Sequence, residues 1–412
     1  MVDVELKTEA GLTKTICFVA SDSEFLFRHF SPAIRAAKAA NAQVYAIIPS
    51  QLRGRASQAD GIKIIASPTS RGDNSLLSMI REALWFAAVL RKIGPSVVVA
   101  YSLRVCLVIA LTETLLRSYR FIFVITGIGF IGISGGLRAR LMRQVVFRAL
   151  GYTSRQRTHF VFENRSDPIS TGIARRGHQV SILMGAGVDP SEFRACELPG
   201  APPFRFATVS RLIWSKGVDL AVGAVSALAR EGYPVELHIY GVPDYANPRP
   251  LAPETLSGVA GIHYHGFSDK IASIWENSHA AIFSSRGGEG LPRALLEAAA
   301  CGRASIVTAV PGCEDFVRNG VEGYTVPVGS ETALKEAILS LINAPHRFGT
   351  LGSRARERVL QTSTTAITQL KYEGLFASQL EMLYARVPLG RSDDRDSTRI
   401  PEKMTIGSLP PH

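Results

Sequence analysis

Two carboxylates eight residues apart, Glu289 and Glu297, have the surroundings best suited to chemistry in this chain. Glu289 stands in the glycine-rich segment 286–290, which follows a short apolar run, residues 279–284, typical of a buried strand of a parallel sheet. Pro292 suits a first helical turn, and the alanine- and leucine-rich residues after it favour a helix that contains Glu297. In an open α/β sheet the loop beyond a strand's carboxyl end binds ligands, and a helix N-terminus attracts anions. The pattern therefore predicts a ligand site.

A glycine-rich loop is common in Rossmann-like units, and Glu297 alone would equally suit the exposed face of a surface helix. The whole segment, however, resembles the E-x7-E signature of the retaining nucleotide-sugar glycosyltransferases of the GT-B type, family 4. The resemblance extends to Gly290-Leu-Pro, to Leu295-Leu-Glu-Ala and to the loop 302–312 with its Thr308-Ala-Val-Pro-Gly. It implies the GT-B fold, an α/β architecture in which two doubly wound Rossmann-like domains face each other across a cleft.

Two cations follow the first strand predicted in the second half of the chain, residues 204–209. Arg211 lies at the carboxyl end of this strand, and Lys216 lies just before the next predicted helix, residues 218–229. An arginine can bind a diphosphate as a bidentate fork and a lysine as a point charge, although either residue alone would suit a solvated loop. The pattern Ser210-Arg-Leu followed by Lys-Gly resembles the pyrophosphate clamp of the same family.

The resemblance also implies roles for the residues around the glycine loop. Glu289 would contact the transferred sugar as the catalytic carboxylate, and Glu297 would contact the ribose hydroxyls; whether Glu289 is a nucleophile or only a stabiliser stays open. The implied donor-binding residues are Arg211, Lys216, Gly287, Gly288, Gly290, Leu291 and Glu297. Cations and N–H groups would stabilise the departing diphosphate in place of Mg²⁺, so we expect no metal and no other cofactor.

The chain of 412 residues is longer than one hydrophobic core usually serves. Apolar strand-like runs alternate with helical patterns in both halves, which is typical of doubly wound parallel sheets. The Pro- and Gly-containing segment 196–203 breaks this periodicity. We predict an acceptor-binding domain over 1–195 and a nucleotide-sugar-binding domain over 204–364. The family resemblance implies that a last helix, over 366–386, crosses back onto the first domain. We expect a disordered tail over 387–412.

Three segments of the first half resemble a bacterial subgroup of this family whose members add sugars to polyprenyl-diphosphate-linked saccharides. They are residues 23–29, 124–131 and 160–164. His29 matches the histidine of that subgroup's first loop and is a candidate catalytic residue, although a lone histidine is more often an ordinary helix residue. Thr126 and Gly127 are candidates for the acceptor site. The loop after the first strand reads Ser21-Asp-Ser where many members have two glycines, so the acceptor loop stays open.

The net charge of +11 comes from the first half of the chain. Residues 1–200 hold 25 Lys and Arg against 14 Asp and Glu, whereas residues 201–412 hold 21 of each. Between Glu113 and Glu163 there are eight arginines and no acid. Such a block indicates an anionic partner, either a membrane surface, a phosphate-bearing substrate or nucleic acid, unless it is only a solvated basic face. No nucleic-acid-binding motif accompanies it, so we expect no nucleic acid partner.

An apolar loop, residues 130–133, stands just before a basic helical pattern over residues 137–150. Apolar and basic residues side by side suit the plane of an anionic membrane surface. We therefore predict that Arg138, Arg140 and Arg143 contact the acceptor's diphosphate or the membrane. The alternative is that these arginines form the solvent-exposed face of a helix that packs inside the domain. No apolar run reaches the ~18–20 uncharged residues of a membrane span.

The first 14 residues are rich in charge and lack the apolar core of a signal peptide. We therefore expect a cytoplasmic protein, attached peripherally to the inner face of the plasma membrane. The five cysteines are scattered and odd in number, which favours reduced thiols. His263 and His265 share one face of a predicted strand, but no third ligand is in view, so we predict no metal site.

These observations predict a retaining glycosyltransferase. It would move an N-acetylhexosamine from a UDP-sugar to a polyprenyl-diphosphate-linked saccharide and form an α-linkage in a surface polysaccharide. Two alternatives stay open. A nucleotide-sugar epimerase of the GT-B fold would act without an acceptor, and the resemblance across the first half argues against it. A non-catalytic polysaccharide-assembly scaffold would keep the fold and lose the site, and the presence of Arg211, Lys216, Glu289 and Glu297 argues against it.

Overall fold

The computed structural model describes residues 14–49, 61–68, 75–129, 132, 136–245, 247 and 249–384. Their strands form two parallel sheets, one on each side of the segment 183–203. The predicted disordered tail, 387–412, lies outside the described residues, and so does the predicted apolar loop 130–133 apart from Gly132. Both predicted doubly wound sheets are present.

The first sheet has seven parallel strands in the order β3-β2-β1-β4-β5-β6-β7. They are β1 (Thr15–Val19), β2 (Gln43–Pro49), β3 (Ile62–Ser67), β4 (Val97–Tyr101), β5 (Arg120–Ile125), β6 (Thr158–Phe162) and β7 (Gln179–Ile182). The central strand β4 is buried at all five positions, because a parallel sheet covered on both faces requires a continuous apolar strand. The carboxyl ends of all seven strands meet at one edge, where loops can form a site.

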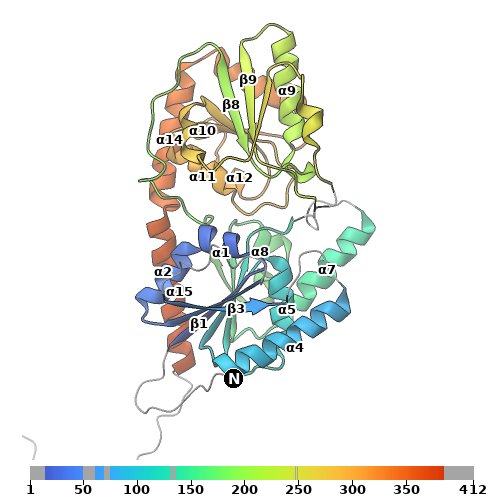
Figure 1. The fold of residues 1–412 in the computed structure, drawn as a ribbon, viewed down its shortest axis with the longest axis vertical. Coiled ribbons are helices and arrows are strands. Elements are labelled where there is room, and N and C mark those ends of the chain that lie inside the picture. The colour runs from blue at the N-terminus through green and yellow to red at the C-terminus, as the bar shows by residue number, and fades with distance from the viewer. Residues whose placement is uncertain are drawn as a thin grey trace, which may run out of the picture.

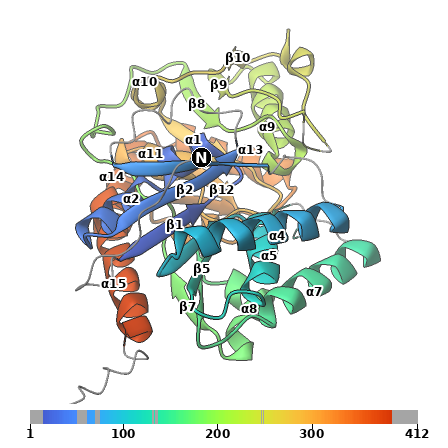
Figure 2. The same ribbon diagram turned by 60° about the horizontal axis from the view of Figure 1, so that its bottom comes forward.

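Helices cover both faces of this sheet (Figure 1). They are α1 (Ser23–His29), α2 (Ser31–Ala39), α4 (Leu76–Ile93), α5 (Leu103–Glu113), α7 (Leu137–Gly151) and α8 (Asp167–Ser170), with the 3₁₀ turn η2 (Ala174–Arg176). The core on one face contains residues of α1 and α2, and the core on the other face contains residues of α4, α5 and α7. Helix α5 contacts both α4 and α7, so these three form one layer (Figure 2).

Two helical patterns of this half are each divided in the structure. Residues 24–40 have helical periodicity with a turn expected near Pro32, and there Phe30 ends α1 while Pro32 lies in the first turn of α2. The pattern over residues 166–176 predicts one helix, but Gly172 adopts a left-handed φ of 73° between α8 and η2. In both places a residue with special backbone preferences interrupts the periodic pattern.

The second sheet has six parallel strands in the order β10-β9-β8-β11-β12-β13. They are β8 (Phe204–Val209), β9 (Val235–Tyr240), β10 (Ile262–Gly266), β11 (Ala280–Phe283), β12 (Ala304–Thr308) and β13 (Gly323–Val326). The helices are α9 (Val218–Arg230), α10 (Ile271–Glu276), α11 (Arg293–Ala300), α12 (Cys313–Phe316), α13 (Glu331–Ile342) and α14 (His346–Thr362), with the 3₁₀ turns η3 (Trp214–Lys216) and η4 (Pro253–Leu256). The strand order reverses between β8 and β11, so the crevice of this sheet opens there.

The last helix, α15 (Thr365–Tyr384), leaves the second sheet and runs along the first (Figure 1). It packs on α2, and its Tyr372 and Phe376 are buried in the same core as Phe18 of β1. Where α15 begins, the Thr365 N–H donates to the Val188 carbonyl at 2.9 Å. We call the first sheet with its helices the first unit, and the second sheet with its helices the second unit. The chain therefore crosses between the two units twice, and a backbone hydrogen bond joins the two crossing segments.

Candidate active site between the two sheets

Two loops leave the carboxyl ends of β8 and β11, the neighbouring strands at which the order of the second sheet reverses. The loop after β8 carries both predicted cations, and the loop after β11 carries Glu289. Hydrogen bonds join the two loops: the Arg286 N–H donates to the Ser215 carbonyl at 2.7 Å, and Ser284 Oγ donates to the Gly217 carbonyl at 2.6 Å. Residues far apart in the sequence therefore meet where an open α/β sheet binds its ligand.

Glu289 and Lys216 form an ion pair at this junction. Lys216 Nζ lies 2.8 Å from Glu289 Oε2 and 2.7 Å from Oε1, and Ser285 Oγ donates to Oε1 at 2.9 Å. The lysine side chain is 21% exposed and the glutamate side chain 12%, so their attraction is less screened than at a free surface. A bound anion would compete with Glu289 for this lysine.

The glycine loop packs against the loop 126–129, which follows β5 of the first sheet. The Gly129 N–H donates to the Gly288 carbonyl at 3.1 Å. A Cβ atom at Gly127 would lie 2.5 Å from the Gly288 oxygen, and one at Gly290 would lie 2.7 Å from the Thr126 oxygen. Side chains at these glycines would clash with backbone of the other unit. The structure therefore brings the predicted acceptor residues Thr126 and Gly127 against the predicted donor loop.

Arg211 does not share the partner of Lys216. Its Nη1 donates to Asp244 Oδ2 at 2.6 Å, and its side chain is 59% exposed. The ion pair with Asp244 is therefore at the surface and weak, so a diphosphate with two charges could draw the guanidinium away. The predicted clamp thus has one cation held by Glu289 and one held by Asp244.

A third cation of the same loops, Arg286, was not among the predicted site residues. Its guanidinium donates to both oxygens of Asp219, at 2.7 and 2.6 Å, and to the Trp214 carbonyl at 2.7 Å. It also lies 4.8 Å from the centre of the Trp214 ring. A bidentate, stacked arginine holds one geometry, so Arg286 fixes the start of the glycine loop to the loop after β8.

Glu297 is buried, at 5% exposure, and the interpretation of Glu297 as a surface helix residue is therefore wrong. Burial raises the pKa of Glu297, while Arg293, one helical turn earlier, donates to Glu297 Oε1 at 2.8 Å and opposes that rise. The Nη1 atom of Arg293 also donates to the Arg28 carbonyl of α1 at 2.6 Å. The second predicted carboxylate is thus linked through one arginine to the first unit.

His29, the predicted catalytic histidine, directly follows Arg28 at the end of α1. Burial, with the positive charges of Arg293 and Arg28, lowers the pKa of His29 to about 3. Its ring packs against the Phe25 ring at a centroid distance of 4.8 Å. The imidazole is therefore neutral at neutral pH, with one nitrogen able to donate a hydrogen bond and the other able to accept one.

Two residues that follow β6, Glu163 and Asn164, support the glycine loop and were not predicted as site residues. Glu163 Oε2 accepts from the Leu291 N–H at 3.1 Å, and Asn164 Nδ2 donates to the Glu289 carbonyl at 3.4 Å. Burial raises the pKa of Glu163 to about 8, and the negative charges of Glu289 and Asp167 add to this rise. The segment 160–164 indicated a strand and a family resemblance, but nothing local placed its last two residues beside Glu289.

Known protein sequences are similar to both units of this chain. The family described as Glycosyl transferases group 1 matches residues 203–344, which contain the second sheet. The second unit is a group 1 glycosyltransferase domain. The transferase is 22% identical over 369 residues to the N,N'-diacetylbacillosaminyl-diphospho-undecaprenol alpha-1,3-N-acetylgalactosaminyltransferase of Campylobacter jejuni, covering 86% of this chain and 96% of that relative. It is 28% identical over 185 residues to a putative colanic acid biosynthesis glycosyltransferase of Salmonella typhimurium, spanning 45% of that relative.

Solved structures share the whole architecture of the transferase. Sucrose-phosphate synthase from Thermosynechococcus elongatus superimposes with a TM-score of 0.73 at 17% identity, covering 89% of this chain and 99% of that chain. HepE from Anabaena, in complex with UDP and glucose, superimposes with a TM-score of 0.66 at 15% identity, covering 89% and 100%. At such identities the similarity is one of fold, and the predicted GT-B fold is confirmed.

The predicted acceptor or membrane arginines of the transferase lie on α7. Arg138 and Arg140 are exposed and Arg143 is half-buried. Helix α7 and helix α4, which belongs to the same layer and also contacts α5, expose large apolar side chains as well. These are Leu137, Leu141, Met142 and Val145 on α7, and Leu76, Leu77, Ile80 and Leu84 on α4. Apolar and basic side chains are therefore both exposed on α4 and α7. These two helices belong to one layer of the first unit (Figure 2).

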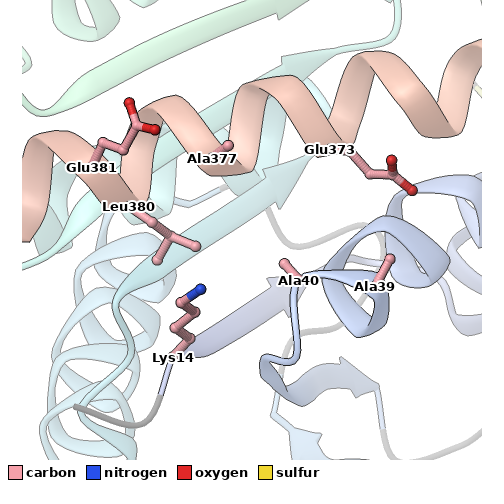
Figure 3. Close-up of a pocket in the computed structure, with 7 residues that line it drawn as sticks. All are labelled: Lys14, Ala39, Ala40, Glu373, Ala377, Leu380 and Glu381. Carbon is pink, nitrogen blue, oxygen red and sulfur yellow. The ribbon is translucent and has the colours of Figure 1, made fainter. Parts of the chain in front are cut away.

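Two cavities lie beside helices of the first unit. One, of 570 Å³, lies between α2 and α15 and is lined by Lys14, Ala39, Ala40, Glu373, Ala377, Leu380 and Glu381 (Figure 3). Lys14 precedes β1, so this cavity is at the amino edge of the first sheet, opposite the site loops. The other, of 330 Å³, is polar and includes Arg28, Arg35, Asp189, Glu192 and Arg293, so it adjoins the contact between α1 and α11. In the part of the chain that is described, no helix is both long and apolar enough to span a bilayer.

Proposed function

We propose that this transferase moves an N-acetylhexosamine from a UDP-sugar to a polyprenyl-diphosphate-linked saccharide during surface polysaccharide biosynthesis. The observation that carries the proposal is the similarity to the Campylobacter relative, which spans both units and is named for an undecaprenol-diphosphate acceptor and an N-acetylgalactosaminyl transfer. The similarity to HepE, whose structure holds UDP and glucose, supports a nucleotide-sugar donor.

On this proposal the donor's diphosphate binds at the loops after β8 and β11. Lys216 and Arg211 would turn from their carboxylate partners toward the diphosphate, and N–H groups of Gly287, Gly288 and the following residues would receive its oxygens. As the bond to the sugar breaks, negative charge grows on the diphosphate, and cations held in a partly desolvated cleft stabilise that charge. Protein groups would thus do the work that Mg²⁺ does elsewhere.

The released carboxylate of Glu289 would face the transferred sugar, where a negative charge stabilises an oxocarbenium-like carbon. Glu297, held by Arg293, would accept hydrogen bonds from ribose hydroxyls. Neutral His29 would contact a hydroxyl of the sugar from the first unit, because a neutral imidazole binds a hydroxyl without adding positive charge. A retaining reaction would then give an α-linked product from an α-linked donor.

The acceptor would approach from the first unit, over Thr126 and Gly127. Its lipid and diphosphate lie at a membrane, and the exposed layer of α4 and α7 would meet that membrane with leucines in the interface and Arg138, Arg140 and Arg143 near phosphates. Each cation at an anionic surface contributes about 1 kcal/mol, so three arginines with several leucines suffice for reversible attachment.

Incubation with radiolabelled UDP-N-acetylhexosamines and polyprenyl-diphosphate-linked saccharides tests the proposal. Label in the organic phase, with an α-anomeric signal in the NMR spectrum of the product, is expected. A free epimer of the donor sugar without transfer would favour the epimerase alternative. Absence of any turnover with intact UDP binding would favour the scaffold alternative.

A further inference from the structure

A cluster of histidines lies on the edge of the second sheet, on strands β9 and β10. The parallel register places His263 directly opposite His238, and Glu236 stands two residues before His238 on the same face of β9. The register shifts between Tyr264 and Gly266, so His265 is in the irregular part of β10. Four side chains with nitrogen or oxygen donors therefore gather on one face of two neighbouring strands.

The donor atoms of this cluster face one another. His238 Nε2 lies 3.2 Å from Glu236 Oε2, and His263 Nε2 lies 3.8 Å from Glu236 Oε1. His238 Nδ1 lies 3.0 Å from His265 Nε2. Within the described ranges, Glu236, His238 and His263 are the one group of His, Cys, Asp or Glu side chains whose ligand atoms, all within 4.8 Å of one another, could hold a metal ion.

The proposed transfer reaction uses none of these residues. Glu236 and His238 lie in the middle of β9, whereas the donor loops leave the carboxyl ends of β8 and β11. The sequence pattern alone offers only His263 and His265, one strand without a third ligand. Pairing of β9 with β10 supplies the missing ligands from 25 residues earlier in the chain, because His238 and His263 are register partners.

We propose that Glu236, His238 and His263 bind one divalent transition-metal ion of the zinc class, at a site separate from the sugar-transfer centre. Zn²⁺ takes imidazole nitrogen and carboxylate oxygen at about 2.0–2.2 Å, so small side-chain rotations would bring the three donors to one ion, with water as a fourth ligand. The carboxylate offsets one of the two positive charges. Mg²⁺ prefers an octahedron of oxygens and is disfavoured by this set.

His265 is suited to orient the central ligand. When Nε2 of His238 binds the metal, its proton must reside on Nδ1, and that N–H then donates to His265 Nε2, already 3.0 Å away. An outer hydrogen bond of this kind fixes the tautomer and the ring orientation of a ligating histidine.

Metal binding here would join β10 to β9 through side chains as well as through backbone. Strand β10 is the edge of the sheet and pairs with β9 alone among the strands that the structure describes. The Gly241 N–H donates to the Gly266 carbonyl at 2.7 Å just beyond the cluster, so an ion would add a side-chain link beside this backbone link. The role assigned to the metal is therefore structural.

Calorimetric titration of the metal-free full-length chain, without a polyhistidine tag, tests the site with Zn²⁺. One equivalent is expected to bind, and His238→Ala and His263→Gln should each weaken binding at least about tenfold. Glu236→Gln keeps the shape of the side chain and should weaken binding as well. His346→Ala, at an exposed histidine elsewhere in the second unit, is the matched control and should leave the affinity unchanged.

Co²⁺ provides an independent readout, because tetrahedral nitrogen–oxygen coordination produces intense visible absorption bands that octahedral hydrated Co²⁺ lacks. These bands should appear with the parent protein and disappear in His238→Ala, and Mg²⁺ should not displace the ion. The site is overturned if Zn²⁺ binds without a defined stoichiometry, or if the three ligand variants, shown to be folded by circular dichroism, bind it as tightly as the parent. An unchanged affinity in His265→Asn would overturn the orienting role of His265.

Discussion

The two sides of the cleft differ in how their charges are arranged. In the second unit four cations around the glycine loop have acidic partners from the same unit. The pairs are Lys216 with Glu289, Arg286 with Asp219, Arg293 with Glu297 and Arg211 with Asp244. In the first unit the arginines of α7 stand among exposed leucines, and the acid facing the glycine loop, Glu163, is buried near other carboxyls. The second unit therefore has a preformed set of ion pairs. The first unit has a basic and apolar surface suited to an amphipathic partner, and it also supports the glycine loop through Glu163.

This difference indicates which unit can compensate the negative charges of each substrate. A donor diphosphate can replace carboxylates that already occupy the cations of the second unit, so binding exchanges one anionic partner of each cation for another. The first unit has a positive excess instead, which suits an anionic surface or a diphosphate brought from outside. Four predictions test this comparison, in order of decreasing effect.

The largest effect is expected for Glu289→Gln. It should lower kcat by on the order of 10³-fold, because the negative charge facing the sugar is lost while the shape remains. Affinity for UDP should not fall, since the proposed partner of Glu289 is the sugar and the lost charge no longer competes with the diphosphate for Lys216. Isothermal titration with UDP and a radiolabel transfer assay separate the two quantities, with Glu276→Gln, at an exposed carboxylate, as control. Equal loss of UDP affinity would reassign Glu289 to the nucleotide.

The triple substitution of Arg138, Arg140 and Arg143 by glutamine should detach the protein from anionic vesicles. About 1 kcal/mol per arginine gives up to ~3 kcal/mol, or roughly a 150-fold weaker partition at low salt. Co-sedimentation across a salt series measures it, because screening reduces the same attraction. Glutamine at Arg194, Arg347 and Arg354, three exposed arginines outside the α4–α7 layer, is the charge-matched control. Indifference of the parent protein to vesicle charge, with full activity on a water-soluble acceptor lacking diphosphate, would refute the membrane role.

Lys216→Ala and Arg211→Ala should each weaken nucleotide-sugar binding or turnover by ~1.5–3 kcal/mol, the scale of one lost charge-assisted hydrogen bond. The loss should be larger for Lys216, because its removal also leaves Glu289 without its cation in a mostly buried place. Lys270→Ala, at an exposed lysine of the same unit, serves as control. Near-normal turnover in both variants would refute the clamp.

The smallest effect is expected for Glu163→Gln, and it concerns pH. The pKa of Glu163, about 8 in the fold, is above its ordinary value near 4.5, so the folded state binds more protons than the unfolded state between these pH values. The free energy of unfolding therefore falls as pH rises from about 4.5 to 8, and is unaffected by Glu163 below that range. Glutamine keeps the acceptor for the Leu291 N–H and removes the titration.

Thermal unfolding at pH 6 and pH 7 measures this difference. The loss of stability between the two pH values should be smaller in Glu163→Gln than in the parent, by roughly 1–2 kcal/mol. Glu336→Gln, at an exposed position of α13, should leave the difference unchanged. An identical pH dependence in Glu163→Gln would show that Glu163 is charged in the fold at neutral pH.

Sequence alone determined the elements whose signals are local. Burial on both faces makes β4 a continuous apolar run, and Ser75 accepts from the Ser78 N–H at the start of α4. The strand, glycine loop and helix around Glu289 were likewise predictable, because the backbone preferences of glycine and proline depend little on their surroundings. The GT-B fold followed from these alternating elements together with the motif resemblance.

Tertiary structure decided which side chains meet. Helical periodicity assigned Glu297 equally to a site or to a surface, and packing on the second sheet buried it. Glu163 and Asn164 reach the glycine loop only because the two units face each other, more than 120 residues apart in the chain. The register of β9 against β10 placed His238 opposite His263. Periodicity reports which face of an element is apolar, but the partner across a cleft or a strand pair is set by long-range packing, which no local pattern encodes.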